Sequence, residues 1–453
     1  MDLSVDVLGG YVSSLCEDLR DEYTIGSEFY KNQNVKRGLR NSDGTGVMAG
    51  VTRIGSVQGY YIEDGERVPM PGRLYYRGYD LMDIVNSHTR DDTFGYEEVA
   101  YLLLMGKLPT AGQFERFNAV LSSARSLPAG FTEDMILKAP SRDVMNKLAR
   151  SVLSLYSYDP SPDDVSIENV ARQSIELIGR FPVIAANAYA AKRHYFDGKS
   201  LYLHTPGEGL SLSENFLRMA RQDKSYTHEE ARLLDLMLMV HAEHGGGNNS
   251  TFACRVLSST GTDTYSAIAA AVGSLKGPLH GGANARVMAM FRDIREHVRD
   301  LRDDDELSAY LRAILSGEAG DGSGKLYGIG HAVYTVSDPR AVLLKKYAMK
   351  MAEESGRGED FHLMERIERL GIPLVTERRC SAIPICANVD MYSGLVYSML
   401  GIPEELYTPL FATARIAGWC AHRIEELVSG GRIMRPAYRA AVSRRDYTPM
   451  SER

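Results

Sequence analysis

The sequence lacks any continuous apolar run of 18 or more residues, so we expect no transmembrane helix in its 453 residues. It also lacks a basic excess, since 52 Lys and Arg stand against 59 Asp and Glu, with a formal net charge of −7. This charge argues against binding to nucleic acid or to an anionic membrane through bulk electrostatics. An anionic small molecule would therefore have to be bound by individually placed arginines.

Cysteines are also scarce: the chain has five, an odd number, scattered and without a CxxC pair. We therefore expect reduced thiols. Cys380 and Cys386 could bind a metal, but ordinary buried thiols are the simpler interpretation. The acidic residues 1–23 have neither a basic n-region nor a long apolar core, so no secretory signal or transit peptide is expected. These features predict a soluble, cytoplasmic protein.

The hydrophobic spacing predicts an all-α fold with a minor β element near the N-terminus. Short strands are expected over 47–63 and 73–76, with a surface hairpin at 61–73, and helix follows helix from Asp91 onward. Thr227 and Glu230 form a capping box for a helix that delivers two histidines. Pro182 is expected to separate a helix over 164–180 from the next one, over 183–195.

Residues 241–284 hold three of the eleven histidines, His241, His244 and His280, each near glycine. Two helical segments, 250–260 and 264–276, lie between them. Gly277-Pro278 should stop the second helix and leave His280 at its end. Histidines at helix ends, beside glycines that allow close backbone approach, indicate a ligand site.

Three further segments carry charged residues in apolar surroundings. In GIGHAVYTVSDPRA (328–341), His331 precedes a helix that Asp338 can cap, with Arg340 in its first turn. Asp390 lies in NVDMYSG (388–394), and Arg415 lies in ATARIAGWCAH (412–422). A buried charge requires a partner, so this set implies an anionic ligand.

These segments, in this order, resemble those of the citrate synthase family, as does GPLHGGAN (277–284). The resemblance extends upstream to AGVTRIGSVQGYY (49–61), LYYRGYDLMDIV (74–85) and TFGYEEVAYLLLMGKLPT (93–110), and it covers most of residues 35–440. It implies a large helical domain (1–281 and 389–453), a smaller helical domain (282–388) and an active site in the cleft between them. It also implies a homodimer in which Arg435, in a C-terminal arm, reaches the partner's site.

The resemblance implies a reaction in which acetyl-CoA condenses with oxaloacetate and the thioester is then hydrolysed. Asp390 suits the base that deprotonates the acetyl group, because a partly desolvated carboxylate is more basic than one in water. His280, as a neutral imidazole, suits the donor to the developing enolate oxygen. His331 suits the donor to the ketone oxygen.

The remaining assignments concern substrate binding. Oxaloacetate would be bound by two neutral side chains and three arginines: His244, Asn248, Arg340, Arg415 and Arg435. The coenzyme A side would be lined by Lys325, Leu326, Tyr327, Gly328, Ile329 and Gly330. No metal and no cofactor are expected, since the acyl-CoA is a substrate.

Alternatives remain open. A 2-methylcitrate synthase would use propionyl-CoA, which differs by one methylene, and no residue decides between the two. A metal-dependent hydrolase is a remote alternative, because His241 and His244 lack the HExxH spacing. A non-catalytic member that retains only ligand binding is a further one. The sequence departs from the family at Gly245, where many members carry an acidic residue, and after Arg435, where it continues as RPAY.

Overall fold

The structure is a computed structural model that describes residues 12, 16, 23–32, 35–41, 44–379 and 383–453. The chain forms two compact units, which we describe separately. Gly50–Met434 holds the sheet and most of the helices, while the other unit combines Met1–Ala49 with Arg435–Arg453. In the described part of that second unit, α2 (Ser27–Asn32), η1 (Arg37–Leu39) and η5 (Met450–Glu452) are short helices. Cys380 lies outside the described residues.

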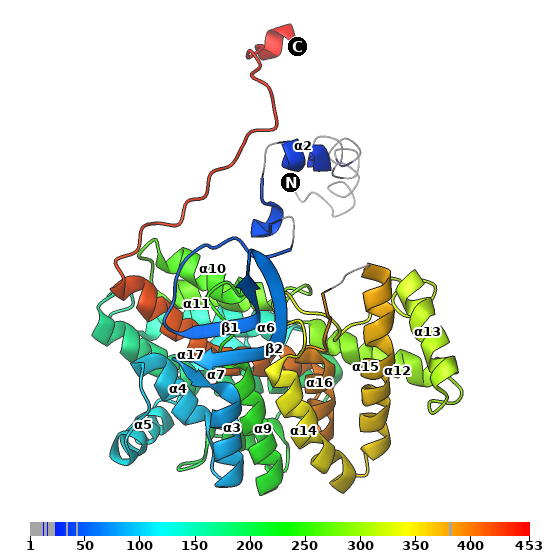
Figure 1. Ribbon diagram of the computed structural model, residues 1–453. Helices are drawn as coiled ribbons and strands as arrows, with labels where there is room; N and C mark the ends of the chain where they lie inside the picture. The colour runs from blue at the N-terminus through cyan, green and yellow to red at the C-terminus, as the bar shows by residue number, and fades with distance from the viewer. Residues whose placement is uncertain (1–11, 13–15, 17–22, 33–34, 42–43, 380–382) are drawn as a thin grey trace. The chain divides into compact units, whose positions relative to one another are not determined.

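A three-stranded antiparallel sheet opens the Gly50–Met434 unit (Figure 1). Strands β1 (Gly55–Glu63) and β2 (Glu66–Tyr76) form a hairpin, and β3 (Tyr79–Asp80) pairs with the end of β2. Asp64 and Gly65, with φ of 51° and 82°, make the two-residue turn. Two residues with positive φ give a turn whose twist matches the right-handed twist of the flanking strands. The predicted surface hairpin is confirmed, and it is longer than predicted.

Helices make up the rest of this unit, which confirms the all-α prediction. The first group is α3 (Leu81–Arg90), α4 (Tyr96–Met105), α5 (Ala111–Ser123), η2 (Thr132–Leu137), α6 (Val144–Ser154), η3 (Leu155–Tyr158), α7 (Ile167–Asp197), α8 (Leu212–Ala220) and α9 (His228–His241). The second is α10 (Asn249–Ser258), α11 (Thr264–Lys276), α12 (Ala283–His297), α13 (Asp304–Ser316), α14 (Pro339–Glu354), α15 (Gly358–Arg379), α16 (Asp390–Met399), η4 (Glu404–Leu406) and α17 (Tyr407–Val428). None of the described helices has the length and apolar character needed to cross a bilayer.

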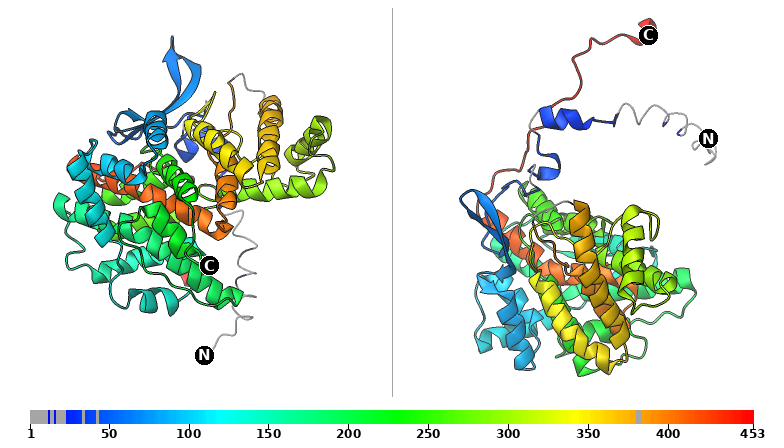
Figure 2. Two further views of the ribbon diagram at one scale, coloured as in Figure 1. Left: turned by 90° about the horizontal axis from the view of Figure 1, so that it is seen from below. Right: turned by 45° about the vertical axis from the view of Figure 1, so that its right-hand side comes forward.

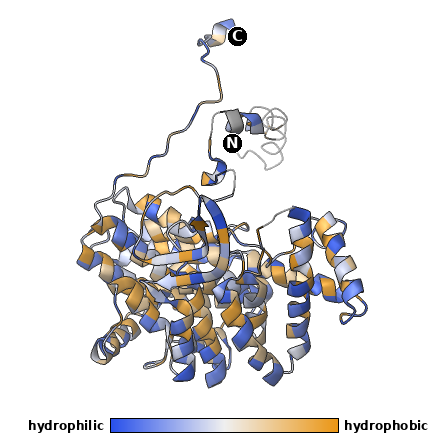
Figure 3. Cartoon of the chain, viewed as in Figure 1, coloured by the Kyte–Doolittle hydropathy of each residue, from blue (hydrophilic) through white to orange (hydrophobic). Residues whose placement is uncertain are grey.

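The helices pack through amphipathic faces around α17. Along α6, for example, Leu148 and Val152 are buried one turn apart, as a 3.6-residue repeat requires. Hydrophobic and hydrophilic residues accordingly alternate along the helical ribbons (Figure 3). Helix α17 is buried along most of its length, from Tyr407 to Glu426. Its charged residue Arg415 is therefore buried as well.

One helix boundary was predicted wrongly. Helix α7 continues through Pro182 to Asp197 instead of stopping before the proline. A proline inside a helix removes one backbone hydrogen bond and usually bends or ends the helix. Here Phe181, Pro182, Val183 and Ile184 are all buried, so tertiary packing keeps the chain helical on both sides of the proline.

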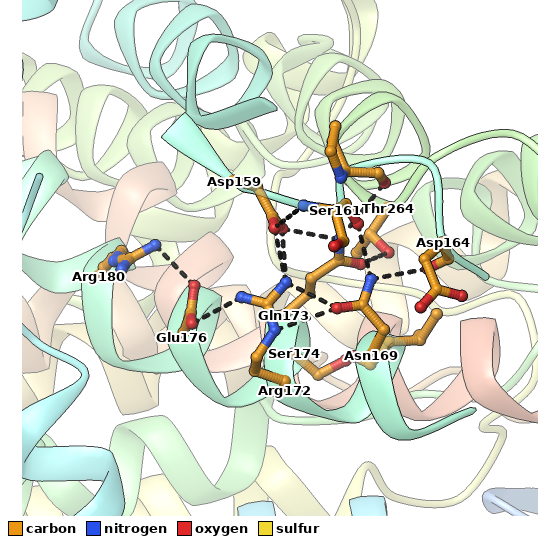
Figure 4. Close-up of polar contacts among 12 residues, drawn as sticks. Asp159, Ser161, Asp164, Asn169, Arg172, Gln173, Ser174, Glu176, Arg180 and Thr264 are labelled. Atoms are coloured by element: carbon orange, nitrogen blue, oxygen red, sulfur yellow. Dashed lines mark hydrogen bonds and ion pairs between the residues drawn. The ribbon is translucent and has the colours of Figure 1, made fainter. Parts of the chain in front are cut away.

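A polar network fixes the start of α7 against α11 (Figure 4). The buried Asp159 carboxylate accepts hydrogen bonds from Arg172 Nη2 at 2.7 Å, Gln173 Nε2 at 2.9 Å and the Tyr265 hydroxyl at 2.7 Å. Gln173 also accepts from Thr264, the first residue of α11. Helix α11 ends four residues before His280, a residue of the site described next, so this network helps to position His280.

Candidate active site

A cavity of about 130 Å³ brings together seven of the residues predicted for the site. Its lining comprises His244, Asn248, His280, Gly281, Asn284, His331, Arg340, Asn388, Val389, Asp390, Phe411 and Arg415. These residues come from the ends of α9 and α11, the starts of α10, α12, α14 and α16, the middle of α17 and the 328–338 loop. Segments distant in sequence therefore converge, in the manner of an active site.

His280 is held as a neutral ring. Helix α11 ends at Lys276, as predicted, and the Ser250 backbone N–H donates to His280 Nε2 at 3.3 Å. Because Nε2 accepts this bond, the proton of a neutral ring lies on Nδ1. Burial, with a smaller effect from Arg415, lowers the pKa of His280 to about 4. The ring can thus donate one N–H bond without carrying charge.

His331 has the opposite tautomer. Its Nδ1 accepts from the backbone N–H groups of Val333 and Tyr334, both at 3.0 Å, which leaves the proton of the neutral ring on Nε2. The Tyr334 ring stacks on it with 4.5 Å between centroids and an interplanar angle of 25°. His244 meets it edge-on at 5.2 Å. The two histidines predicted for catalysis therefore offer different ring nitrogens as donors.

Asp390 begins α16, and its backbone N–H donates to Asn388 Oδ1 at 3.0 Å. Burial raises the pKa of Asp390 to about 6, although the charges of Arg340 and Arg415 oppose this shift. A carboxylate with a raised pKa is a stronger base and still ionises near neutral pH. The environment therefore suits the predicted role in proton abstraction.

The two predicted arginines of the cavity differ in their pairing. Asp338 caps α14, as predicted, and also accepts from Arg340 Nε at 3.0 Å and Arg340 Nη2 at 2.7 Å. Arg415 donates from Nε to the His241 carbonyl oxygen at 2.6 Å, but its buried Nη1 and Nη2 have no hydrogen-bond partner among the described residues. Burial lowers the pKa of Arg415 to about 10, so the guanidinium is still charged at neutral pH.

Two unpartnered guanidinium nitrogens in a small cavity form a ready site for a carboxylate. His244 adds a third unpartnered buried atom, Nε2, among the described residues. Burial and the nearby arginines hold the pKa of His244 well below its ordinary value. The cavity therefore presents a positive charge and a neutral imidazole, which together match a small polar anion.

The loop after His244 explains the departure from the family at Gly245. Gly245 has φ of 82°, a left-handed conformation that favours glycine. Its N–H donates to the buried Glu243 carboxylate at 2.5 Å, and the His422 Nε2 lies 2.9 Å from the same oxygen. Glu243 thus provides an acidic group on the other side of His244 and fixes the turn of the loop.

Sequence reasoning missed several residues of the site. Asn284, Asn388 and Phe411 line the cavity, and Asp338 was predicted as a helix cap but not as the partner of Arg340. Asn388 Nδ2 donates to the Gly330 carbonyl oxygen at 2.8 Å. Of these residues, only Asn388 had a local signal in the sequence, because it lies in the NVDMYSG segment two residues before Asp390.

The predicted coenzyme A segment lies beside the site and is partly buried. The N–H of Gly330 donates to Cys386 O and the N–H of Asn388 donates to Gly328 O, both at 2.8 Å. These bonds tie the segment to the start of α16. Leu326 and Ile329 are buried in the core, whereas Lys325 is exposed. Coenzyme A binding by these residues stays a prediction.

Other observations delimit the site. Arg435 is exposed and belongs to the unit that contains the C-terminal segment, so its predicted contact with oxaloacetate stays a prediction. A larger, open cavity of about 1250 Å³ lies between α4, α5, α7 and the 203–211 loop, and none of the predicted site residues line it. Among the described residues, no cluster of three His, Cys, Asp or Glu side chains could hold a metal ion.

Comparison with known proteins identifies the family of this chain. Residues 42–437 match the family model described as the citrate synthase C-terminal domain. A citrate synthase of Haloferax volcanii is 35% identical, covering 92% of this chain and 99% of the relative. A 2-methylcitrate synthase of Corynebacterium glutamicum is 33% identical, covering 93% and 99%.

Solved structures give the same assignment. Citrate synthase from Thermotoga maritima has a TM-score of 0.72 and 30% identity, covering 92% of this chain and 99% of its own. The Thermoplasma acidophilum enzyme, solved with carboxymethyl coenzyme A and oxaloacetate, has a TM-score of 0.73 and 28% identity over the same shares. The helical fold, the converging histidine, aspartate and arginine side chains and these matches agree, and the chain belongs to the citrate synthase family, whose members are acyl-transferring enzymes.

Proposed function

We propose that this enzyme condenses acetyl-CoA with oxaloacetate to give citrate and coenzyme A. The observation that carries the proposal is that one cavity holds two groups: the buried Arg415, two of whose nitrogens have no hydrogen-bond partner among the described residues, and the buried Asp390, a carboxylate of raised pKa. The arginine suits a carboxylate substrate, and the aspartate suits proton abstraction from a carbon acid. Arg340, His244 and Asn248 complete the oxaloacetate site.

In the proposed mechanism, the Asp390 carboxylate removes a methyl proton from acetyl-CoA. The Nδ1–H of His280 donates to the thioester oxygen while negative charge develops on it. The enol carbon then forms a bond to the ketone carbon of oxaloacetate, and the ketone oxygen takes a proton from Nε2 of His331. The methyl proton that Asp390 took is released, and a proton returns to Nε2 of His331, which restores both groups. Water finally cleaves the thioester, which releases coenzyme A.

We also propose the domain division implied by the family, with a small domain over 282–388 and a large domain formed by 1–281 and 389–453. The cavity lining includes residues from both sides of these boundaries, such as Arg340 and Arg415. Residues 325–330 would border the coenzyme A moiety at this junction. The reaction would serve the tricarboxylic acid cycle in the cytoplasm.

The decisive experiment measures thiol release from acetyl-CoA and from propionyl-CoA, each with and without oxaloacetate. Release that requires oxaloacetate and is faster with acetyl-CoA is expected. A preference for propionyl-CoA would instead assign a 2-methylcitrate synthase. Oxaloacetate-independent hydrolysis that a chelator abolishes would indicate a metal-dependent hydrolase, and no release at micromolar enzyme would contradict the condensation reaction.

We propose that the active enzyme is a homodimer in which Arg435 serves the partner's site. Mixing the inactive variants Asp390→Asn and Arg435→Met, with subunit exchange, tests this. One site of each mixed dimer would hold an intact Asp390 and receive an intact Arg435, so activity should recover to about a quarter of the wild-type value. No recovery, with mixed dimers demonstrated by mass, would contradict the exchange of Arg435.

A further inference from the structure

The β1–β2 hairpin packs closely against the segment that leads from His331 to Arg340 and forms hydrogen bonds with it. Residues 331–338, here called the His331 segment, contain neither helix nor strand apart from one isolated bridge, Pro71 to Ser337. Figure 2 shows the hairpin beside α14, the helix that follows this segment. The segment carries one predicted proton donor at its start and leads into one predicted carboxylate ligand.

The hairpin ladder is interrupted at the point where the His331 segment meets it. Gln58 pairs with Arg73 and Tyr60 pairs with Pro69, so the register shifts at Gly59 and leaves Met70, Pro71 and Gly72 without partners in β1. Prolines lack an N–H and are found at such irregularities. A bulge of this kind redirects a strand, and here it turns β2 toward Ser337.

Hydrogen bonds join the two elements at this interruption. The Gly72 N–H donates to Ser337 O at 3.1 Å and lies 3.2 Å from Ser337 Oγ. The hydroxyl of Thr335, which is buried, donates to Gly59 O at 2.6 Å. The hairpin therefore uses the backbone groups of its bulge to hold the His331 segment.

Both glycines are required by the close approach of the His331 segment. A Cβ at Gly59 would lie 2.4 Å from Val333 O and 2.7 Å from Tyr334 Cα. A Cβ at Gly72 would lie 2.1 Å from Ser337 O and 2.6 Å from Tyr334 Cδ1. These distances are well below van der Waals contact, so any larger residue would displace the segment.

Tyr334 connects the two glycines of the hairpin with the site residues His331 and Arg340. Its backbone and ring pack against the two glycines, and its ring stacks on His331 at 4.5 Å. The Arg340 guanidinium carbon lies 5.7 Å from the centroid of the same ring. A shift of Tyr334 would therefore move both the ketone donor and a carboxylate ligand.

We propose that the β1–β2 hairpin positions His331 and Arg340 for oxaloacetate, with Gly59, Gly72 and Thr335 as positioning residues. This inference rests on the proposed function, because it assigns these two side chains to the oxaloacetate site. At Gly59, Gly72 and Thr335 the hairpin contacts the His331 segment, so the effect of these three residues should fall on oxaloacetate and on the condensation step. The binding of acyl-CoA at saturating oxaloacetate should be unaffected.

The test compares Thr335→Val, Thr335→Ser, Gly59→Ala and Gly72→Ala with wild type, using Gly112→Ala as the matched control. A Cβ at Gly112 meets nothing within 4 Å. The Val variant should raise the KM for oxaloacetate roughly 5- to 50-fold and lower kcat, with the KM for acyl-CoA unchanged. The Ser variant should restore both constants, and the glycine variants should resemble Val or exceed it.

The outcomes separate this inference from the proposed function. If wild type releases coenzyme A with oxaloacetate but Thr335→Val keeps both constants within about twofold of wild type, the hairpin contact is only structural and the inference fails while the function stands. An equal increase in the KM for oxaloacetate and in the KM for acyl-CoA would also overturn the inference while the function stands. If wild type releases no coenzyme A, the function and the inference fail together. Thr335→Val keeps the test available even if a glycine variant does not fold.

Discussion

At the scale of single residues, the two buried arginines of the cavity differ in whether a carboxylate of the described residues forms an ion pair with them. Asp338 binds Arg340 through two hydrogen bonds, whereas two nitrogens of Arg415 have no protein partner among the described residues. Removing one member of a buried ion pair leaves the other charge uncompensated, but removing an unpaired charge does not. The two sites should therefore respond differently to the same substitution.

We expect Arg340→Met to lower the free energy of unfolding by about 3–5 kcal/mol. Arg415→Met should lower the free energy of unfolding by less, because Arg415 forms no ion pair among the described residues and only its electrostatic attraction to Glu243 and Asp390 is lost. Both variants should weaken oxaloacetate binding roughly 30-fold or more. Urea unfolding and calorimetric titration of the purified variants measure the two effects, and equal destabilisation by both substitutions would contradict the assignment of Arg415 as the arginine without an ion-pair partner.

Asp390 provides a prediction about pH. Burial raises the pKa of Asp390 to about 6, and only the ionised carboxylate can accept a proton, so kcat/KM for acetyl-CoA should rise with pH through about 6. Asp390→Asn should lower kcat by roughly 10²- to 10⁴-fold and remove this limb of the profile. Asp223→Asn, at an exposed carboxylate, is the control. An unchanged profile in Asp390→Asn would exclude Asp390 as the base.

Apart from Asn248, which the family resemblance implied, the predicted residues of the cavity share one property: a charged or ring side chain in an apolar or glycine-rich segment. His280, Asp390 and Arg415 were found in this way. Asn284 and Phe411 could not be, because an asparagine in a helix and a phenylalanine in a core helix give no local sign of a ligand. The pairing of Asp338 with Arg340 required the side-chain geometry.

At the scale of elements, α9 ends three residues before His244, and the first residues of α9 are capped. Thr227 and Glu230 make the predicted capping box at that start. Thr227→Ala should therefore lower the free energy of unfolding by about 0.5–2 kcal/mol and leave both KM values unchanged, because the helix is 14 residues long. Thr227→Ser should restore stability. A changed oxaloacetate KM in Thr227→Ala, with stability preserved, would contradict this separation.

Element boundaries were predictable where local chemistry decides them and not where packing does. Asp338 and Pro339 start α14, and Gly277 ends α11, as their cap and breaker chemistry requires. Pro182 has the same tendency to end a helix, but it lies in a buried stretch of α7, where tertiary packing overrides that tendency. The contact between the β1–β2 hairpin and the His331 segment joins residues more than 260 positions apart, so sequence periodicity could not show it.

At the scale of the whole molecule, we propose that oxaloacetate favours domain closure by binding to Arg415. A ligand shifts a conformational equilibrium only by its difference in affinity for the two states. Oxaloacetate can provide such a difference by binding Arg340 in the proposed small domain together with Arg415 and His244 in the large one. Closure would also exclude water from the acyl-CoA until condensation.

Solution scattering can measure this closure. Oxaloacetate should reduce the radius of gyration of the wild-type enzyme, while Arg415→Met should show no change at the same ligand concentration because one end of the bridge is missing. Arg415→Met is preferred to Arg340→Met here, since the loss of Asp338 pairing would confound shape with stability. Identical scattering curves for wild type with and without saturating oxaloacetate would rule out closure by this ligand. The bridge between domains would then have to form only when acyl-CoA is also bound, and the order of substrate binding would no longer follow from Arg415.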